Sequence, residues 1–279
     1  MMTAIGSEGT NAYTSNDVTC YVENIPSNEI DTWARVQGDR FQNMVIRGFH
    51  TELEAVYEEY NIGLSSDWRK VYAALFAKLF PTHPYGTQTT IGLGEHLKNP
   101  SITNIKNYFN KYYVPNNIAI CLSGDLDPDK TVASIEKYFG NWKPSAHIDV
   151  PQFPAQPALT APVDTTVVGK EAPMLFMGWR ADASKSLQLD TLEVIAQLLS
   201  NGQAGLFDLD LSQKLKVQEV SAGIADMDEY SVFYVYGQPK SGQTLQEVRS
   251  LALSEIEKLK KGNFSDDLLP SIVNNYKRY

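Results

Sequence analysis

The sequence predicts an α+β protein, and three observations carry this prediction. Short runs rich in threonine, tyrosine and valine have the composition of strands. Other segments repeat apolar residues with the 3.6-residue period of amphipathic helices. Strands and helices are grouped more than strictly alternated, and the second half repeats the first in kind, which favours α+β over a chain of βαβ units.

Composition limits the classes of function. The 279 residues suffice for two domains, and 43% hydrophobic with 20% charged residues is a globular composition. A net charge of −9 without a basic cluster argues against nucleic acid or an anionic membrane as a partner. The longest apolar runs, such as residues 118–122, are far shorter than a membrane span. Residues 1–19 lack the basic and apolar regions of a signal peptide, so the location stays unassigned.

The first half is predicted to open with two strands in residues 9–26, separated by the polar break "SND". A further strand is expected at residues 118–124. Ser27, Ser101 and Asp127 are candidate N-caps, because their side-chain oxygens can accept a free N–H of the first helical turn. The helices are expected at residues 27–43, 51–61, 67–79, 102–113 and 127–139.

A proline-rich stretch at residues 143–163 is predicted to be an extended connector, because each proline fixes φ and removes a donor. Residues 1–142 and 164–279 would then form two domains. In the second half, strands are expected at 173–181, 217–225 and 229–238, and helices at 187–199, 205–216, 243–261 and 266–278.

The stretch "TELEAVYEEYN", residues 51–61, carries four glutamates on an amphipathic helix. Glu52 and Glu59 are seven residues apart and share one flank of its apolar stripe, whereas Glu54 and Glu58 lie on the opposite flank. The Cα atoms of Glu52 and Glu59 would be roughly 10 Å apart, which suits one metal ligand and one supporting acid better than two ligands of one ion. On spacing alone, however, an exposed acidic face with ordinary ion pairs is the favoured interpretation.

Other candidate motifs are weak. "GDLDPDKT" lacks the glycine of a calcium loop and contains Pro128, so a helix cap at Asp127 is the better interpretation. "GLGEHL" lacks the third glycine of a dinucleotide-binding turn, and "NFS" is better explained by a helix cap at Ser265 than by glycosylation.

Histidines and cysteines give no motif either. The histidines show no helical pairing, which indicates surface or turn positions rather than ligands; they are His50, His83, His96 and His147. Cys20 and Cys121 lie in apolar, strand-like runs, and both buried free thiols and one disulfide stay open.

Several segments, in order, resemble the M16 zinc metallopeptidases, the family of pitrilysin, insulinase and the mitochondrial processing peptidase. They are "GSEGTNAYTSNDVTCYVENIPSNEID", "TELEAVYEEYN", "LFPTHPYG", "YYVPNNIAICLSGD", "APMLFMGWRA", "LLSNGQAGLFDLDLSQKL" and "VSAGIADMDEYSVFYVYG". The resemblance covers nearly the whole chain and implies repeats in which an antiparallel-rich sheet is packed with helices.

The resemblance also implies a site. Glu59 matches the third ligand of the catalytic Zn²⁺, and Glu52 matches the acid that supports a histidine ligand. Asn11 and Ala12 match the edge strand that pairs with an extended peptide substrate. The implied activity is zinc-dependent hydrolysis of unfolded or short peptides.

The H-x-x-E-H helix that supplies two histidine ligands in the family is absent, since "GLGEH" has Gly92 in the first histidine's place. Both ends of the chain resemble cuts through a larger protein, so we expect an inactive fragment of a peptidase without bound zinc. The alternative is a non-catalytic scaffold or peptide-binding subunit, paired as a homo- or heterodimer with another M16-like chain.

Overall fold

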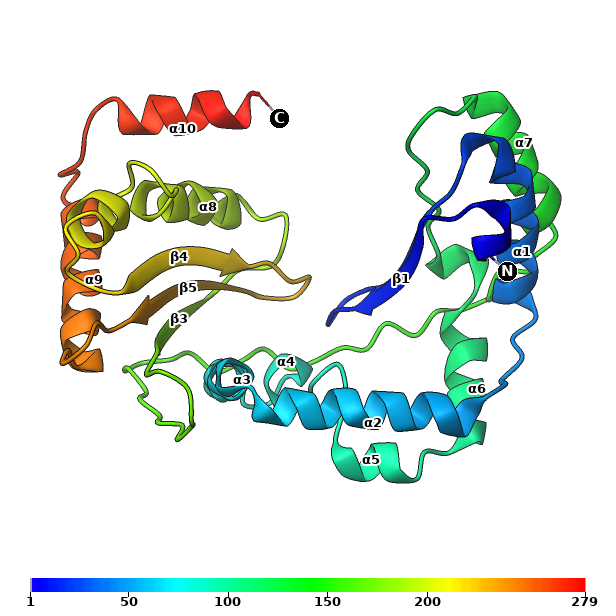
Figure 1. Ribbon diagram of the computed structural model, residues 1–279, viewed down its shortest axis with the longest axis horizontal. Coiled ribbons are helices and arrows are strands. Elements are labelled where there is room, and N and C mark those ends of the chain that lie inside the picture. The colour runs from blue at the N-terminus through cyan, green and yellow to red at the C-terminus, as the bar shows by residue number, and fades with distance from the viewer. Residues whose placement is uncertain (1, 279) are drawn as a thin grey trace. The chain divides into compact units, whose positions relative to one another are not determined.

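The computed structural model describes residues 2–278, which divide into two compact units. The first unit contains the residues up to Asn61 together with Thr90–Phe153. The second contains Ile62–Thr89 and the residues from Pro154 onward. Figure 1 labels most of the helices and strands of both units.

The first unit combines a hairpin with helices. Strands β1 and β2 pair antiparallel from Gly9 opposite Asn24 to Thr14 opposite Thr19. Helix α1 packs against α7, where Gly38 lets the backbone of Tyr138 approach closely. The elements are β1 (Gly9–Thr14), β2 (Thr19–Asn24), α1 (Ile30–Gln42), α5 (Gly94–Lys98), α6 (Ile102–Tyr112), α7 (Pro128–Phe139) and short 3-10 helices at Met2–Ile5, Ser27–Glu29 and Pro115–Asn117; α2 (Phe49–Ser65) begins here and ends in the second unit.

The second unit is built around a three-stranded antiparallel sheet with the order β3-β5-β4. Helices α8 and α9 contact this sheet and α10 packs on α8 (Figure 1). The elements are α3 (Asp67–Leu79), α4 (Pro84–Thr87), β3 (Leu175–Ala181), α8 (Leu187–Leu199), a π-helix (Asp208–Ser212), β4 (Glu219–Ala225), β5 (Ser231–Gln238), α9 (Leu245–Lys260) and α10 (Leu268–Tyr276).

Each face of this sheet has its own apolar core. Residues of α8 and α9, including Leu199 and Val248, pack with Val220 and Val235 in one cluster. Helix α3 packs against β3, where a Cβ on Gly178 would lie 3.0 Å from Leu75, so the absence of a side chain lets the helix approach. The second cluster joins Phe76, Leu79 and Phe80 of the α3 region to Val232 of β5.

Three polar side chains fasten α3 and its neighbouring segments to the rest of the second unit. Asp67 accepts N–H bonds from Glu171 (2.7 Å) and Lys170, and its partner Lys70 lies at 2.8 Å. His83, 1% exposed, accepts the N–H of Tyr85 at Nδ1 and directs Nε2 to Glu229 at 3.0 Å. Arg180 donates to the carbonyls of Leu79 and Pro157.

Most predicted elements are present, and the exceptions are informative. The predicted strand at residues 118–124 is wrong, because this segment has no strand partner in residues 2–278. Ser27 does not cap α1 with its side chain, whereas Ser101 and Asp127 cap their helices as predicted. The helix expected at 205–216 is shorter and centred on the π-helix Asp208–Ser212.

The two compact units differ from the two domains predicted on either side of the proline-rich connector. Residues 62–89 pack with the C-terminal part because α3 covers a face of the sheet formed there. The segment 143–163 has no helix or strand. The domain boundaries at 142 and 164 stay a prediction, since compact units follow only the contacts made within this chain.

Asp67 makes stability depend on pH. The Lys70 ammonium and the N–H groups of Glu171 and Lys170 lower the pKa of Asp67 to about 2, against an ordinary value of 3.8. Since the folded-state pKa is the lower one, its contribution to stability is complete above about pH 4 and is lost as the pH falls toward 2. We expect Asp67→Asn to lower the urea midpoint at neutral pH and to flatten the profile in this acid window. Asp266→Asn, an exposed carboxylate, is the control; coincident profiles for Asp67→Asn and wild type would contradict this role.

Candidate functional site

Helix α2 carries the acidic pair predicted from the sequence. None of its 17 residues is buried, and both Glu52 and Glu59 are exposed. Its stripe is only half covered: the rings of Tyr57 and Tyr60 stack at 6.2 Å. Helix α5 lies against this stripe, since a Cβ on Gly94 would lie 2.8 Å from the Tyr60 ring. The flank bearing Glu52 and Glu59 is exposed.

Neither carboxylate is engaged within residues 2–278. Within these residues the carboxylates of Glu52 and Glu59 form no hydrogen bond or ion pair, although such glutamates commonly find a lysine or arginine on a helix surface. The interpretation favoured by spacing alone was an exposed acidic face with ordinary ion pairs; the exposure is confirmed, and the ion pairs are absent from this flank within the described residues. A carboxylate left without a protein partner is available to a ligand or to a further chain segment.

The residues present do not fit a complete zinc site. Catalytic zinc takes three protein ligands and a water molecule. Within residues 2–278 no three His, Cys, Asp or Glu side chains come together around a common point. Glu59 can supply one anionic oxygen and no more, so no chemical step can be assigned to a metal held by this chain alone.

The histidines stand apart from the acidic pair. His83 is buried and bonded to Tyr85 and Glu229, and His147 lies 2.9 Å from Asp149 on the surface. His50 is exposed beside Phe49, and His96 is exposed within α5. All four lie at surface or turn positions as expected, although the turn that holds His83 is buried and its ring is packed between aromatic side chains.

Asn11 and Ala12 lie on β1, every residue of which is exposed. They pair with Val22 and Tyr21 of β2, and among the described residues β1 has no strand on its other side. This edge has no strand partner among the described residues, which is what β-augmentation by an extended peptide requires. The N–H of Ala12 donates to Oδ1 of Asn11 at 2.9 Å. No hydrogen bond within residues 2–278 connects this edge to Glu52 or Glu59.

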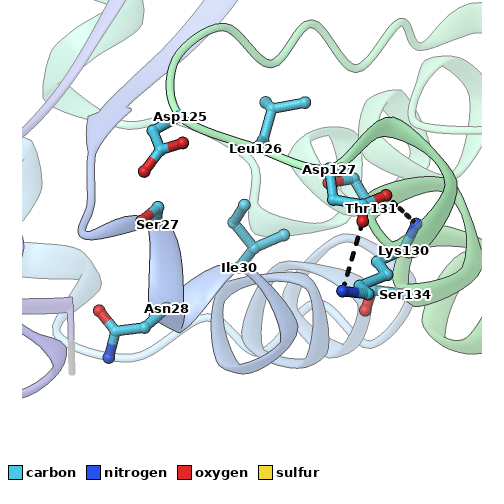
Figure 2. A pocket seen from close by; sticks show the side chains of 9 residues that line it. All are labelled: Ser27, Asn28, Ile30, Asp125, Leu126, Asp127, Lys130, Thr131 and Ser134. Carbon is cyan, nitrogen blue, oxygen red and sulfur yellow. Dashed lines mark hydrogen bonds and ion pairs between the residues drawn. The ribbon is translucent and has the colours of Figure 1, made fainter.

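A cavity of about 240 Å³ lies where the loop of Asp125 and Asp127 meets the start of α1 (Figure 2). Asp127 accepts the N–H of Lys130 at 3.2 Å and pairs with its ammonium at 3.3 Å. Asp127 therefore caps α7 with its side chain, as predicted.

Of the two alternatives left open by the sequence, the structure shows free thiols rather than a disulfide at Cys20 and Cys121. Neither thiol is buried, since Cys121 is exposed and Cys20 half-buried. The strand expected around Cys121 does not form, which leaves that segment open to solvent.

Sequence reasoning missed a second cavity, of about 520 Å³, within the second unit. Its lining includes Trp68 and Tyr72 of α3, Phe176 of β3, and Tyr234 and Tyr236 of β5. The signals were local: Trp68 and Tyr72 are one helical turn apart, and Tyr234 and Tyr236 alternate onto one face of a strand. What the sequence did not reveal is that α3 and β5 face each other.

Comparison with known proteins identifies the family. A family model described as "Peptidase M16 inactive domain" matches residues 101–276. The chain therefore belongs to the M16 peptidase family, which confirms the resemblance seen in the sequence.

Curated relatives bear names of the same kind. The chain is 25% identical over 285 residues to "Zinc protease PqqE" of Helicobacter pylori, covering 96% of this chain and 62% of that protein. It is 27% identical over 139 residues to the "Probable mitochondrial-processing peptidase subunit beta" of Schizosaccharomyces pombe, covering 49% of this chain and 30% of that protein. The chain thus spans less than two thirds of the length of these relatives.

Solved structures confirm the mixed fold of helices and antiparallel sheet. A protease from Helicobacter pylori superposes with a TM-score of 0.87 at 22% identity, over 99% of this chain and 68% of that one. A "peptidase M16 inactive domain" from Pseudomonas fluorescens superposes with a TM-score of 0.80 at 13% identity, over 99% of this chain and 67% of that one.

No described helix has the length and apolar character to cross a membrane.

The exposure of the acidic pair predicts its energetic effect in this chain. We expect Glu52→Gln and Glu59→Gln to change the free energy of unfolding by less than about 0.5 kcal/mol, because neither carboxylate has a partner to lose. Glu23→Gln is the matched comparison: the side chain of Glu23 is 8% exposed and accepts bonds from Trp33 and Gln37, so loss of its charge should cost about 1–3 kcal/mol. Urea denaturation of the three variants measures this, and a large effect at Glu59 would mean that the chain itself engages it.

Proposed function

We propose that this chain is part of an M16 zinc endopeptidase acting on unfolded or short peptides, to which it contributes Glu59 as one zinc ligand. The observation that carries the proposal is the open flank of α2. Two carboxylates two turns apart on one helix face are exposed and without partners, in a chain whose relatives are named zinc proteases.

Helix geometry separates two roles, and the family resemblance assigns them. With Cα atoms roughly 10 Å apart, Glu52 and Glu59 do not suit one ion together. The resemblance matches Glu59 to the ligand, so Glu52 would accept the N–H of a histidine ligand and fix its orientation. The two histidines would come from a segment that this chain does not contain. The length of PqqE supports this proposal, because the matched region covers only 62% of that protein.

The substrate would lie along β1. An extended peptide beside Asn11 and Ala12 would pair with the free edge, so its backbone would supply most of the affinity and its side chains the selectivity. The all-exposed pattern of β1 supports this assignment, because no described side chain of the protein blocks the strand.

A second candidate is a non-catalytic scaffold or peptide-binding subunit that pairs with another M16-like chain. It is favoured by the description of the matching family as an inactive domain, and one relative is named as a subunit of a processing peptidase. The exposed flank of α2 and the β1 edge would then be binding surfaces only.

Zinc content separates the proposed roles. We expect this chain alone to bind no stoichiometric zinc and to cleave no peptide, because one carboxylate leaves the metal mostly to solvent. In the protein extended by an H-x-x-E-H segment, Glu59→Gln should remove zinc. Glu52→Gln should keep zinc but lower peptidase activity by about 10–100-fold.

Glu54→Gln is the control, since Glu54 lies on the same helix but on the opposite flank and should leave both zinc and activity unchanged. Equal zinc loss in Glu52→Gln and Glu59→Gln would refute the roles. An extended protein that contains all ligands yet neither binds zinc nor cleaves peptides would favour the scaffold.

A further inference from the structure

The aromatic cavity of the second unit lies between α3 and one face of the sheet. Alternation along the strands brings Tyr234 and Tyr236 to the face that also bears Phe176, which is paired with Tyr236. Phe176 stacks on Tyr234 with ring centroids 5.2 Å apart. Trp68 stacks on Tyr72 at 5.1 Å, and Tyr72 stacks on Phe76 at 4.2 Å. These contacts fix the walls of the cavity, while Trp68 stays 45% exposed and therefore accessible.

The charge of the lining is negative. Glu219 of β4 is the one charged residue among the described lining residues, which include no lysine or arginine. Ser221 pairs with Tyr236, so Glu219 lies diagonally across from that tyrosine on the same face. Burial raises the pKa of Tyr72 to about 12; burial and then the Glu219 carboxylate raise the pKa of Tyr236. The phenols therefore stay neutral at ordinary pH, and the carboxylate is unopposed within the cavity.

An edge strand borders the cavity. Among the described residues, β4 pairs with β5 alone, so its outer edge offers free N–H and C=O groups. An extended segment lying beside β4 would direct every second side chain to the face that bears Ser221 and the aromatic rings. This arrangement fits a side chain carried by a peptide better than a small free cation.

We propose that this cavity binds the guanidinium or ammonium group of an arginine or lysine side chain on an extended peptide segment that pairs with β4. Aromatic faces attract such cations through their quadrupoles, most strongly that of tryptophan. Glu219 supplies the counter-charge, and the β4 edge holds the backbone. The site goes beyond the proposed peptidase role and uses none of its residues, so its failure and that of the zinc site are distinguishable.

The test is fluorescence polarisation of the full chain with labelled, capped hexapeptides of valine and threonine that differ at one central position. We expect arginine and lysine peptides to bind, and the citrulline peptide, which keeps the shape of arginine without its charge, to bind at least about tenfold more weakly. Norleucine or phenylalanine peptides that bind as tightly as the arginine peptide would overturn the cation assignment, as would the absence of binding by any peptide. Prolines on both sides of the arginine should abolish binding, and unchanged affinity would overturn pairing with β4.

Variants locate the site. Trp68→Ala and Glu219→Gln should each weaken binding of the arginine peptide by about tenfold. Trp68→Phe should keep most of the affinity because it keeps an aromatic face. Glu219→Gln should leave the weak affinity for the citrulline peptide unchanged. Tyr108→Ala and Glu136→Gln remove an exposed ring and an exposed carboxylate in the first unit and should have no effect. Equal binding by wild type, Trp68→Ala and Glu219→Gln would place the peptide elsewhere and refute the proposal.

Discussion

The architecture of the second unit depends on the need to cover both faces of one small sheet. β5 is its central strand, and Val232 and Val235 on opposite faces of it are both fully buried. Helices α8 and α9 cover one face, but the other is covered by α3, which precedes β3 by about a hundred residues in the chain. Burial of large apolar side chains is worth about 1.5–3 kcal/mol each, so this second layer contributes much of the stability of the unit. The polar contacts of Asp67, His83 and Arg180 then fix where α3 lies rather than whether it packs.

Local features of the fold could be predicted from the sequence, and contacts between distant segments could not. The hairpin of β1 and β2 and the helices α3 and α7 follow from turn residues, caps and apolar periodicity, all of which act within a few residues. The run at residues 118–122 has a strand's composition but forms no ladder, because a strand also needs a neighbour that its own residues do not specify. Similarly, Ser27 has a capping side chain, yet the chain enters α1 through a 3-10 turn and leaves the hydroxyl unused.

The candidate site shows the same limit. Periodicity placed Glu52 and Glu59 on one flank, and their roles came from family resemblance. That resemblance does not say whether the flank is covered in this chain. The structure shows that both carboxylates are exposed, as spacing alone favoured, but that neither forms an ion pair within residues 2–278. The aromatic cavity was out of reach for a different reason: Trp68 and Tyr236 are far apart in sequence, and only the packing of α3 on the sheet brings their rings to one space.

The two hairpins present edge strands in different surroundings. In both β1–β2 and β4–β5 the first strand lies at an edge among the described residues, and a helix follows the second strand. Every residue of β1 is exposed, so a segment paired there would meet little but backbone and would be recognised mainly by its extended conformation. β4 instead lies beside a floor of aromatic rings and a carboxylate, which can discriminate among side chains. The difference arises because α3 covers the sheet of the second unit only in part: its Leu75 and Leu79 close the face over Gly178, while Trp68 and Tyr72 stop short of the β4 edge and leave the cavity.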